Sequence, residues 1–184
     1  MHPPSSAIPD FYYALFAFYE PALTIIGFIG ALSDPETTHN TQAPWPADTP
    51  PPAVLPKASV VTIIQLAHVC ALMGVINFFV LTAARDYLSS HPALQEKIVR
   101  ALMIPLLLGD AMHLYVTLWA LGHDRWDVAK WSPMLWATVV LGFSLMVPRI
   151  MWHLGIWRYV DTRDRLPADA ARHSGPHNDK AAQS

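Results

Sequence analysis

The stretch from Ala101 to Tyr115 reads ALMIPLLLGDAMHLY, an apolar run that carries the ionisable residues Asp110 and His113. An ionisable residue at membrane depth costs about 2.5–3.5 kcal/mol on insertion scales, so its presence there indicates a specific role. Ionisable residues also interrupt the three other apolar runs of the chain, which hold Glu20, His68 and the pair Arg149 and His153.

The composition predicts an integral membrane protein. Of 184 residues, 53% are hydrophobic and only 14% are charged, whereas an average soluble domain has about 25% charged residues. The net charge of −2 provides no basic surface, so we expect no nucleic-acid partner. Because Cys70 is the single cysteine, an intrachain disulfide is excluded, and we expect a buried, inert thiol.

Four apolar runs, at about 11–32, 59–84, 99–121 and 132–157, reach the roughly 20 residues that span a bilayer. Backbone polar groups must be satisfied internally in lipid, so each run should be a helix. The predicted fold class is therefore all-α, an integral membrane bundle of four transmembrane helices over residues 1–160. The polar tail, 161–184, is expected to be disordered.

The connections between the spans differ in character. Residues 33–57 hold seven prolines, which predicts an extended Pro-rich loop without regular helix between the first two spans. Pro92 is expected near the start of the third helix. Gly27, Gly30 and Gly74 would allow the first two spans to approach closely.

Charge predicts the orientation. The first and third connections carry only Lys57, Arg125 and Lys130, whereas the second connection and the tail carry Arg85, Lys97, Arg100, Arg158, Arg163 and Arg165. The positive-inside rule then places both termini in the cytosol. The endoplasmic reticulum is the expected location of a multi-pass protein that shows no other address.

Glu20 lies near the middle of the first span, on one helical face with Phe16 and Thr24. Pro21 follows it and removes a backbone hydrogen bond, so we expect a kink there. The carboxyl either bonds across helices to fix packing or takes part in chemistry.

Asp110 and His113 are three residues apart and share a helical face, so the carboxylate can set the tautomer of the imidazole. The alternative is a structural ion pair between Asp110 and Arg149, which lies at similar depth in the fourth span. No H-x-x-x-H or C-x-x-C motif stands nearby, so we expect no metal and no cofactor.

The second and fourth spans hold further polar side chains. Gln65 and His68 share one face of the second span, and Asn77 lies on nearly the opposite face. Trp152 adjoins the Arg149 and His153 face, where an interfacial position is also expected. The residues predicted to bind substrate or support the site are therefore His68, Arg149, Gln65, Asn77 and Trp152.

Three motifs resemble known families: the aromatic start followed by Tyr19-Glu20-Pro21, the Gly109-Asp110-x-x-His113 pattern, and a last span that bears Trp and Arg. Over about residues 8–160 they resemble a family of small fungal four-helix membrane proteins of unassigned function. More remotely, the chain resembles the fungal membrane terpene cyclases and the emopamil-binding-protein (EXPERA) group of sterol isomerases. In those cyclases two intramembrane acids are thought to protonate the substrate, which implies Glu20 and Asp110 here.

The leading hypothesis is a membrane-embedded acid–base enzyme, a cyclase or isomerase of a terpenoid-like lipophilic substrate in secondary metabolism. Asp110 is the expected principal acid, Glu20 a second acid or base, and His113 the orienting partner, with Arg149 balancing the charge. The alternative is a non-enzymatic lipid-binding or accessory subunit whose polar residues fix packing. A transporter is a third reading, which would require a homo-oligomer because the four spans show no internal repeat.

Overall fold

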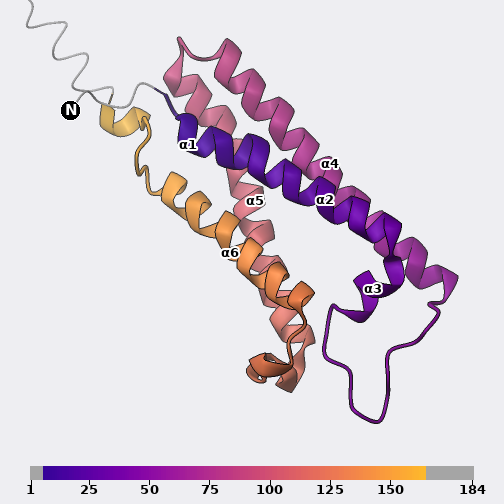
Figure 1. Cartoon of the computed structure of the whole chain (residues 1–184). Coiled ribbons are helices and arrows are strands. Elements are labelled where there is room, and N and C mark those ends of the chain that lie inside the picture. The colour runs from indigo at the N-terminus through magenta and orange to yellow at the C-terminus, as the bar shows by residue number, and fades with distance from the viewer. Residues whose placement is uncertain (1–5, 165–184) are drawn as a thin grey trace, which may run out of the picture.

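The computed structural model describes residues 6–164, and this part of the chain is all-helical, without a strand (Figure 1). The first long helix comprises α1 (Asp10–Tyr13), the π-helical segment η1 (Ala14–Tyr19) and α2 (Glu20–Ser33). It is followed by α3 (Pro35–Asn40), α4 (Lys57–Tyr87), α5 (Pro92–Ala120), the short 3₁₀ turns η2 (Gly122–Trp126) and η3 (Val128–Lys130), and α6 (Pro133–His153).

Four helices of the described chain are long and apolar enough to cross a membrane: Asp10–Ser33, Lys57–Tyr87, Pro92–Ala120 and Pro133–His153. The predicted all-α architecture of four membrane helices is confirmed. Many large apolar side chains point outward, including Ile26, Leu66 and Phe79 with exposed fractions of 64–65%. Such a surface is suited to lipid rather than to water.

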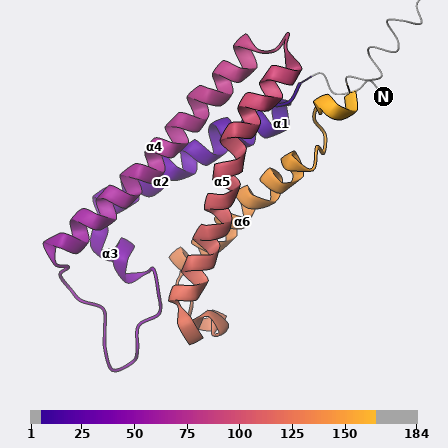
Figure 2. The same cartoon turned by 180° about the vertical axis from the view of Figure 1, so that it is seen from behind.

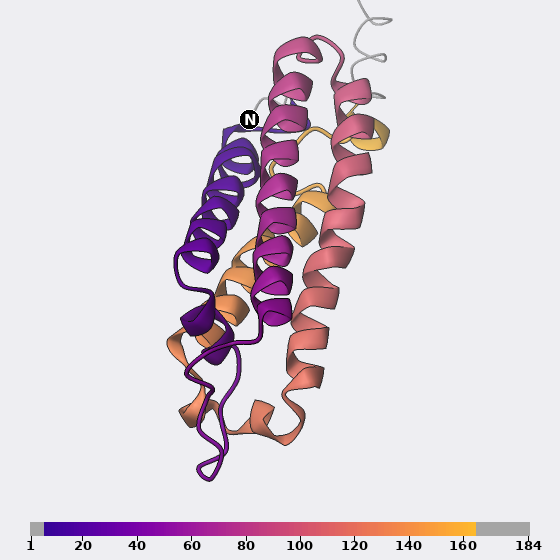
Figure 3. The ribbon, with the colours of Figure 1, turned by 90° about the vertical axis from the view of Figure 1, so that its right-hand side faces the viewer.

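The helices form two antiparallel pairs, with α2 packed along α4 and α5 packed along α6. The two pairs meet at one end and diverge toward the other, so the bundle is V-shaped in Figures 1 and 2. Seen from the side, in Figure 3, the four helices run roughly parallel. The V shape therefore arises because the α2–α4 pair and the α5–α6 pair diverge from each other, while the two helices within each pair stay in contact.

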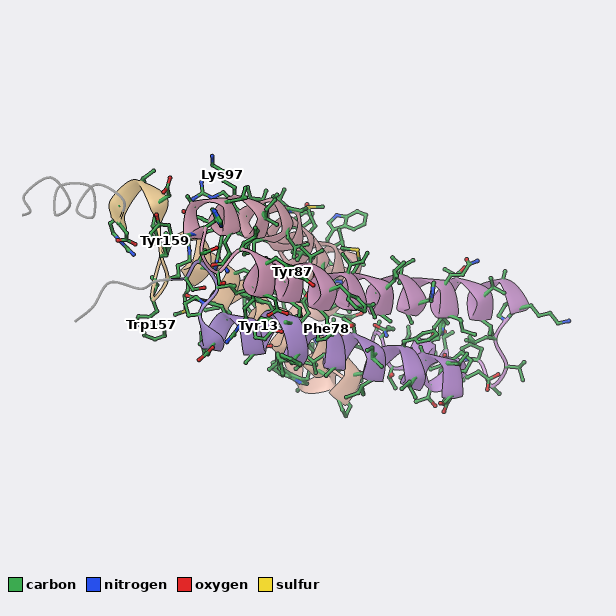
Figure 4. The ribbon with its side chains drawn as sticks, turned by 90° about the horizontal axis from the view of Figure 1, so that it is seen from above. Tyr13, Phe78, Tyr87, Lys97, Trp157 and Tyr159 are labelled. Carbon is green, nitrogen blue, oxygen red and sulfur yellow. The ribbon has the colours of Figure 1, made fainter. Side chains whose placement is uncertain are left out.

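The narrow end of the V gathers three segments that are distant in the sequence. The backbone N–H of Tyr159 donates to the carbonyl of Ser6 at 2.9 Å. Figure 4 shows Trp157 and Tyr159 at the same end as Lys97, which follows the α4–α5 turn. The segments that precede α1 and follow α6 thus share one end with that turn, while α3, η2 and η3 lie at the wide end (Figure 1).

The buried core also lies toward the narrow end, where both pairs are in contact. It consists of Ile8, which precedes α1, and of residues from every long helix: Tyr12, Phe16, Ala17, Leu81, Ala84, Val99, Met103 and Trp152. Burial of these side chains holds the two pairs together at this end. Toward the wide end the pairs are joined by isolated polar contacts, such as Ser132 Oγ donating to the carbonyl of Thr41 at 2.5 Å.

Gly74 sets the close approach of α4 to α2. A Cβ at this position would meet the Thr24 side chain and would lie 2.9 Å from the Cα of Pro21. Only glycine fits there, as the sequence predicts for this residue. The prediction for Gly27 and Gly30 is wrong, because added Cβ atoms there would meet nothing within 4 Å.

One predicted helix end is confirmed and another needs correction. The third helix begins at Pro92, as predicted, seven residues before the apolar run at 99. The fourth helix ends at His153, not at 157. Gly155 adopts φ +74° and its N–H bonds to the carbonyl of Trp152, a left-handed turn that terminates the helix.

Two segments expected to lack structure are also helical. The Pro-rich connection contains α3, because Pro35 is compatible with a first helical turn and Asp34 caps the helix by accepting from the Thr37 N–H at 2.9 Å. Residues 161–164 form a helical turn whose Asp161 N–H donates to Glu96 at 2.7 Å. The rest of the predicted disordered tail, 165–184, lies outside the described residues.

Candidate functional site

Arg149 on α6 is the centre of a polar cluster inside the bundle. Its guanidinium is fully buried and donates through Nη2 to Glu20 and through Nη1 to Asp110. The ring of Phe16 covers it, with the guanidinium carbon 5.2 Å from the ring centroid. The predicted ion pair of Asp110 with Arg149 is confirmed, and Glu20 joins it as a second carboxylate.

The helix around Glu20 is locally irregular. Pro21 has no N–H, so the regular hydrogen-bond ladder is interrupted, and the N–H of Glu20 bonds to the carbonyl of Leu15, five residues back. This π-helical segment turns both Phe16 and Glu20 into the interior, with exposed fractions of 0% and 6%. Segments of this kind occur frequently at functional sites.

Asn77 contributes the polar side chain of α4. It is completely buried and its amide lies within reach of the Glu20 carboxyl. Neither its Oδ1 nor its Nδ2 has a hydrogen-bond partner of good geometry, and the Nε of Arg149 also lacks one. Each of the four long helices therefore supplies one polar side chain: Glu20, Asn77, Asp110 and Arg149.

The cluster lies at membrane depth. Glu20 follows the start of the first helix by ten residues, and Asn77 precedes the end of α4 by ten. At 1.5 Å per residue both are about 15 Å from the narrow end of the bundle. This is about half the thickness of a hydrocarbon core.

The charges in the cluster do not balance. Two carboxyl groups face one guanidinium, so full ionisation would leave a net charge of −1 in a medium of low dielectric constant. One proton on the carboxyl pair, or a positive charge on His113, would make the cluster neutral. His113 lies one turn along α5, within range of a charge interaction with Asp110.

One side of the cluster is accessible. The side chain of Asp110 is 15% exposed, against 8% for Glu20 and 0% for Arg149. Beyond Asn77, in the direction of the wide end, the same face of α4 continues with Leu66, Cys70 and Met73, and all three are exposed. The prediction that Cys70 is buried is therefore wrong, because its helix face has no partner helix there. The cluster therefore lies where the helix pairs separate and their inward faces become accessible.

The structure does not bring the other predicted residues into the cluster. Gln65 and His68 are exposed on α4, on other faces than Asn77, and His68 packs edge-on against Phe28 with ring centroids 5.8 Å apart. His113 is also largely exposed, although it neighbours Asp110.

Trp152 lies in the core at the narrow end, away from an interfacial position, because it is fully buried. Its Nε1 donates to the carbonyl of Ala7 at 2.8 Å. The guanidinium of Arg158 stacks on its ring at 3.9 Å. Trp152 thus connects the segment before α1 to the segment after α6 and supports the site by packing.

Glu96 and Arg158 form a second buried cluster, which the sequence analysis missed. Arg158 Nη1 donates to Glu96 at 2.9 Å, and Arg100 donates to the same carboxylate at 2.8 Å. Burial lowers the pKa of Arg158 and the Glu96 carboxylate opposes that effect. Neighbouring Gln95 accepts from the Ala7 N–H at 2.8 Å and donates to the Ala84 carbonyl at 3.0 Å. These bonds close the narrow end.

One sequence signal could have suggested this closure. The polar pair Gln95 and Glu96 lies three and four residues after Pro92, so a helix that starts at Pro92 places both side chains in its first turns. The partner Arg158 is 62 residues away, and nothing in the sequence pattern connects the two.

A family model described as a domain of unknown function, DUF7704, matches residues 5–159. The chain belongs to the DUF7704 family. The DUF7704 region contains all four residues of the polar cluster as well as Glu96 and Arg158. No curated protein and no solved structure matches the chain.

The DUF7704 cluster has the chemical means for proton transfer. Two carboxyl groups share one guanidinium. One carboxyl can therefore donate a proton while the other accepts one, and the net charge of the cluster stays the same. Among residues 6–164 no group of three or more His, Cys, Asp or Glu side chains is arranged to hold a metal ion.

Proposed function

We propose that this protein is a membrane-embedded acid–base enzyme, a cyclase or isomerase of a terpenoid-like lipophilic substrate. The observation that carries the proposal is the placement of Glu20 and Asp110 on the single guanidinium of Arg149, at membrane depth, with Asp110 partly accessible. Carboxyl groups in an apolar site are suited to act as general acids.

The proposed step requires no co-reactant. Protonated Asp110 donates its proton to one carbon of a C=C bond, whose π electrons form the new C–H bond and leave a cation on the neighbouring carbon. Glu20 then removes a proton from an adjacent carbon, and the electrons of that C–H bond form the new double bond. One C–H bond forms and one breaks, which is an isomerisation. Attack of a second double bond on the cation would instead close a ring.

Two further features support the proposal. The ring of Phe16 covers the Arg149 guanidinium and helps to exclude water from the cluster, which strengthens the charge interactions there. The resemblance to membrane terpene cyclases and sterol isomerases gives the same two acids the protonating role and favours a place in secondary metabolism. Arg149 balances the charge and His113 orients Asp110.

The experiment uses membranes of a heterologous host that expresses the full chain. The membranes are incubated in D₂O buffer with a panel of linear prenyl olefins and their terminal epoxides. We expect a product that carries one deuterium at the newly formed C–H bond. Asp110→Asn and Glu20→Gln should each reduce its formation by about 10²-fold or more, the usual contribution of a positioned acid or base.

The matched control is Asp86→Asn, which removes an exposed carboxylate near the end of α4 and should leave turnover unchanged. Protein abundance is measured in parallel by quantitative blotting. Full turnover by both cluster variants at normal abundance would refute the acid–base proposal.

A second candidate function is a lipid-binding or accessory membrane subunit. It is favoured by the way the two ion pairs of Arg149 join the first helix, α5 and α6, because such links also fix helix packing. This function predicts that Asp110→Asn and Glu20→Gln lower protein abundance or partner association, with no product lost because none is made.

For location, we propose the endoplasmic reticulum with both termini in the cytosol. The described narrow end carries Arg85, Lys97, Arg100, Arg158 and Arg163, and the wide end carries Lys57, Arg125 and Lys130. This excess of positive charge supports a cytosolic narrow end.

A further inference from the structure

The polar cluster contains an unusual concentration of unpartnered buried atoms. Among residues 6–164 four buried side-chain nitrogen or oxygen atoms have no hydrogen-bond partner: Asn77 Oδ1, Asn77 Nδ2, Arg149 Nε and His153 Nε2. Three of the four belong to residues that adjoin Glu20. A buried polar atom without a partner loses its hydrogen bonds to water and gains none in return, so a ligand or water group that satisfies these atoms is favoured.

The arrangement of donors and acceptors specifies the missing group. Arg149 Nε and Asn77 Nδ2 can only donate, whereas Asn77 Oδ1 can only accept. The oxygen of a hydroxyl group can accept from Asn77 Nδ2 while its hydrogen is donated to Asn77 Oδ1, so one hydroxyl satisfies both atoms of the amide. An ether or carbonyl oxygen cannot donate and would leave Asn77 Oδ1 unpartnered.

The surroundings indicate what the hydroxyl is attached to. On α4 the face of Asn77 continues toward the wide end with Leu66 and Met73, which are 65% and 40% exposed. With Cys70 they form an exposed apolar strip along α4 that leads to the amide. An isolated water molecule would leave this strip uncovered, whereas the apolar chain of an alcohol would cover it.

We propose that the amide of Asn77 binds the hydroxyl group of a lipophilic alcohol whose apolar chain lies along Leu66, Cys70 and Met73. The inference rests on the proposed function for its lipophilic substrate and adds the polar group by which that substrate is held. The bound hydroxyl positions the chain beside Asp110 and Glu20. Binding does not require turnover, so the two proposals fail separately.

The test measures binding to the purified full chain in detergent micelles. The probe is all-trans-farnesol, compared with farnesyl methyl ether, which has the same chain and cannot donate a hydrogen bond. Dissociation constants are determined from the shift of the thermal unfolding midpoint with ligand concentration. We expect farnesol to bind the wild-type protein about tenfold more tightly than the ether, as expected for one satisfied buried acceptor.

The decisive variant is Asn77→Leu, which replaces the amide with an apolar side chain of similar size and removes two unpartnered atoms. It should fold with equal or higher stability and should bind farnesol and the ether equally. The matched control, Gln65→Leu, makes the same kind of change at an exposed position of the same helix and should keep the tenfold preference.

Two results would overturn the proposal. Equal binding of farnesol and its ether by the wild-type protein would mean that the amide holds only water or nothing. An undiminished preference for farnesol in Asn77→Leu would place the hydroxyl elsewhere. The comparison of the two ligands on the wild-type protein decides the question even if Asn77→Leu does not fold.

Discussion

Arg149 connects two acidic side chains that are 90 residues apart in the sequence (Glu20 and Asp110). Its full burial means that the guanidinium cannot be hydrated and depends on both carboxyls for its partners. The reverse also holds, because without Arg149 the two carboxyls would face each other in an apolar interior. The cluster therefore has to be considered as one unit rather than as separate pairs.

A first prediction concerns this unit. Arg149→Met should lower the free energy of unfolding by about 3–5 kcal/mol, because it leaves buried charges without a partner. Adding Glu20→Gln and Asp110→Asn to Arg149→Met removes those charges and should recover most of the loss. Reversible unfolding in mixed micelles measures both variants. Equal stability of the single and the triple variant would show that the charges are not coupled.

Among single residues, the sequence could identify the acids and the arginine but not all of their neighbours. Glu20, Asp110 and Arg149 were found because each interrupts an apolar run. On α4, however, His68 and Asn77 lie on nearly opposite faces, so only one of them can face the interior. Helical spacing predicts which residues share a face, but it does not predict which face of the helix is turned toward the interior. That choice depends on packing, here on Gly74 against Pro21 and Thr24.

At the scale of elements, α2 and α4 form the closest helix pair because of one glycine. Gly74→Ala should destabilise the protein by about 1–3 kcal/mol, since the added Cβ overpacks the contact with Thr24 and Pro21. Gly27→Ala is the matched control on the partner helix, where a Cβ meets nothing within 4 Å. It should be neutral or stabilising, because alanine favours a helix. Thermal unfolding in detergent compares the two variants, and an equal effect would contradict the assigned contact.

The short helix α3 gives a prediction about pH. The backbone N–H of Thr37 lowers the pKa of Asp34 by bonding to its carboxylate. Because the folded-state pKa lies below the unfolded value, the cap's contribution is present above the unfolded pKa. It is lost as the pH falls through the folded pKa. We expect the Thr37 amide resonance in detergent micelles to move toward its uncapped position on acidification.

Asp34→Asn is the control for this helix. Asparagine also caps helices well but does not titrate, so α3 should persist and the acid-dependent shift of the Thr37 resonance should disappear. If the shift remains in this variant, a group other than Asp34 causes it.

The elements were predicted best where one physical requirement dominated. Length and apolarity determined the four spans because lipid allows few alternatives. The ends were less predictable from hydropathy alone: Pro92 marks the start of α5 in a polar region by its turn chemistry, whereas Gly155 ends α6 within an apolar run. There the local turn chemistry prevailed over hydropathy. The closure by Glu96 and Arg158 could not be predicted, since it depends on the tertiary meeting of the two segments.

At the scale of the whole molecule, the segments at the narrow end place residues 6–9 and 154–164 beside the α4–α5 turn. This requires that both segments and that turn lie on one side of the membrane. An Asn-x-Thr glycosylation acceptor introduced into the 41–56 connection should be modified in microsomes. The same acceptor in the 88–91 turn should remain unmodified. Modification of the turn site alone would reverse the proposed orientation.

The V shape has a mechanical consequence. With the narrow end fixed by Glu96, Arg158 and Trp152, each helix pair acts as a lever that pivots there, and α4 is about 46 Å long. A rotation of about 5° at the pivot would displace the far tip by about 4 Å, since displacement grows with lever length. Lipophilic molecules of different widths could thus be accommodated at the wide end, while the polar cluster around Arg149, which lies nearer the pivot, moves much less.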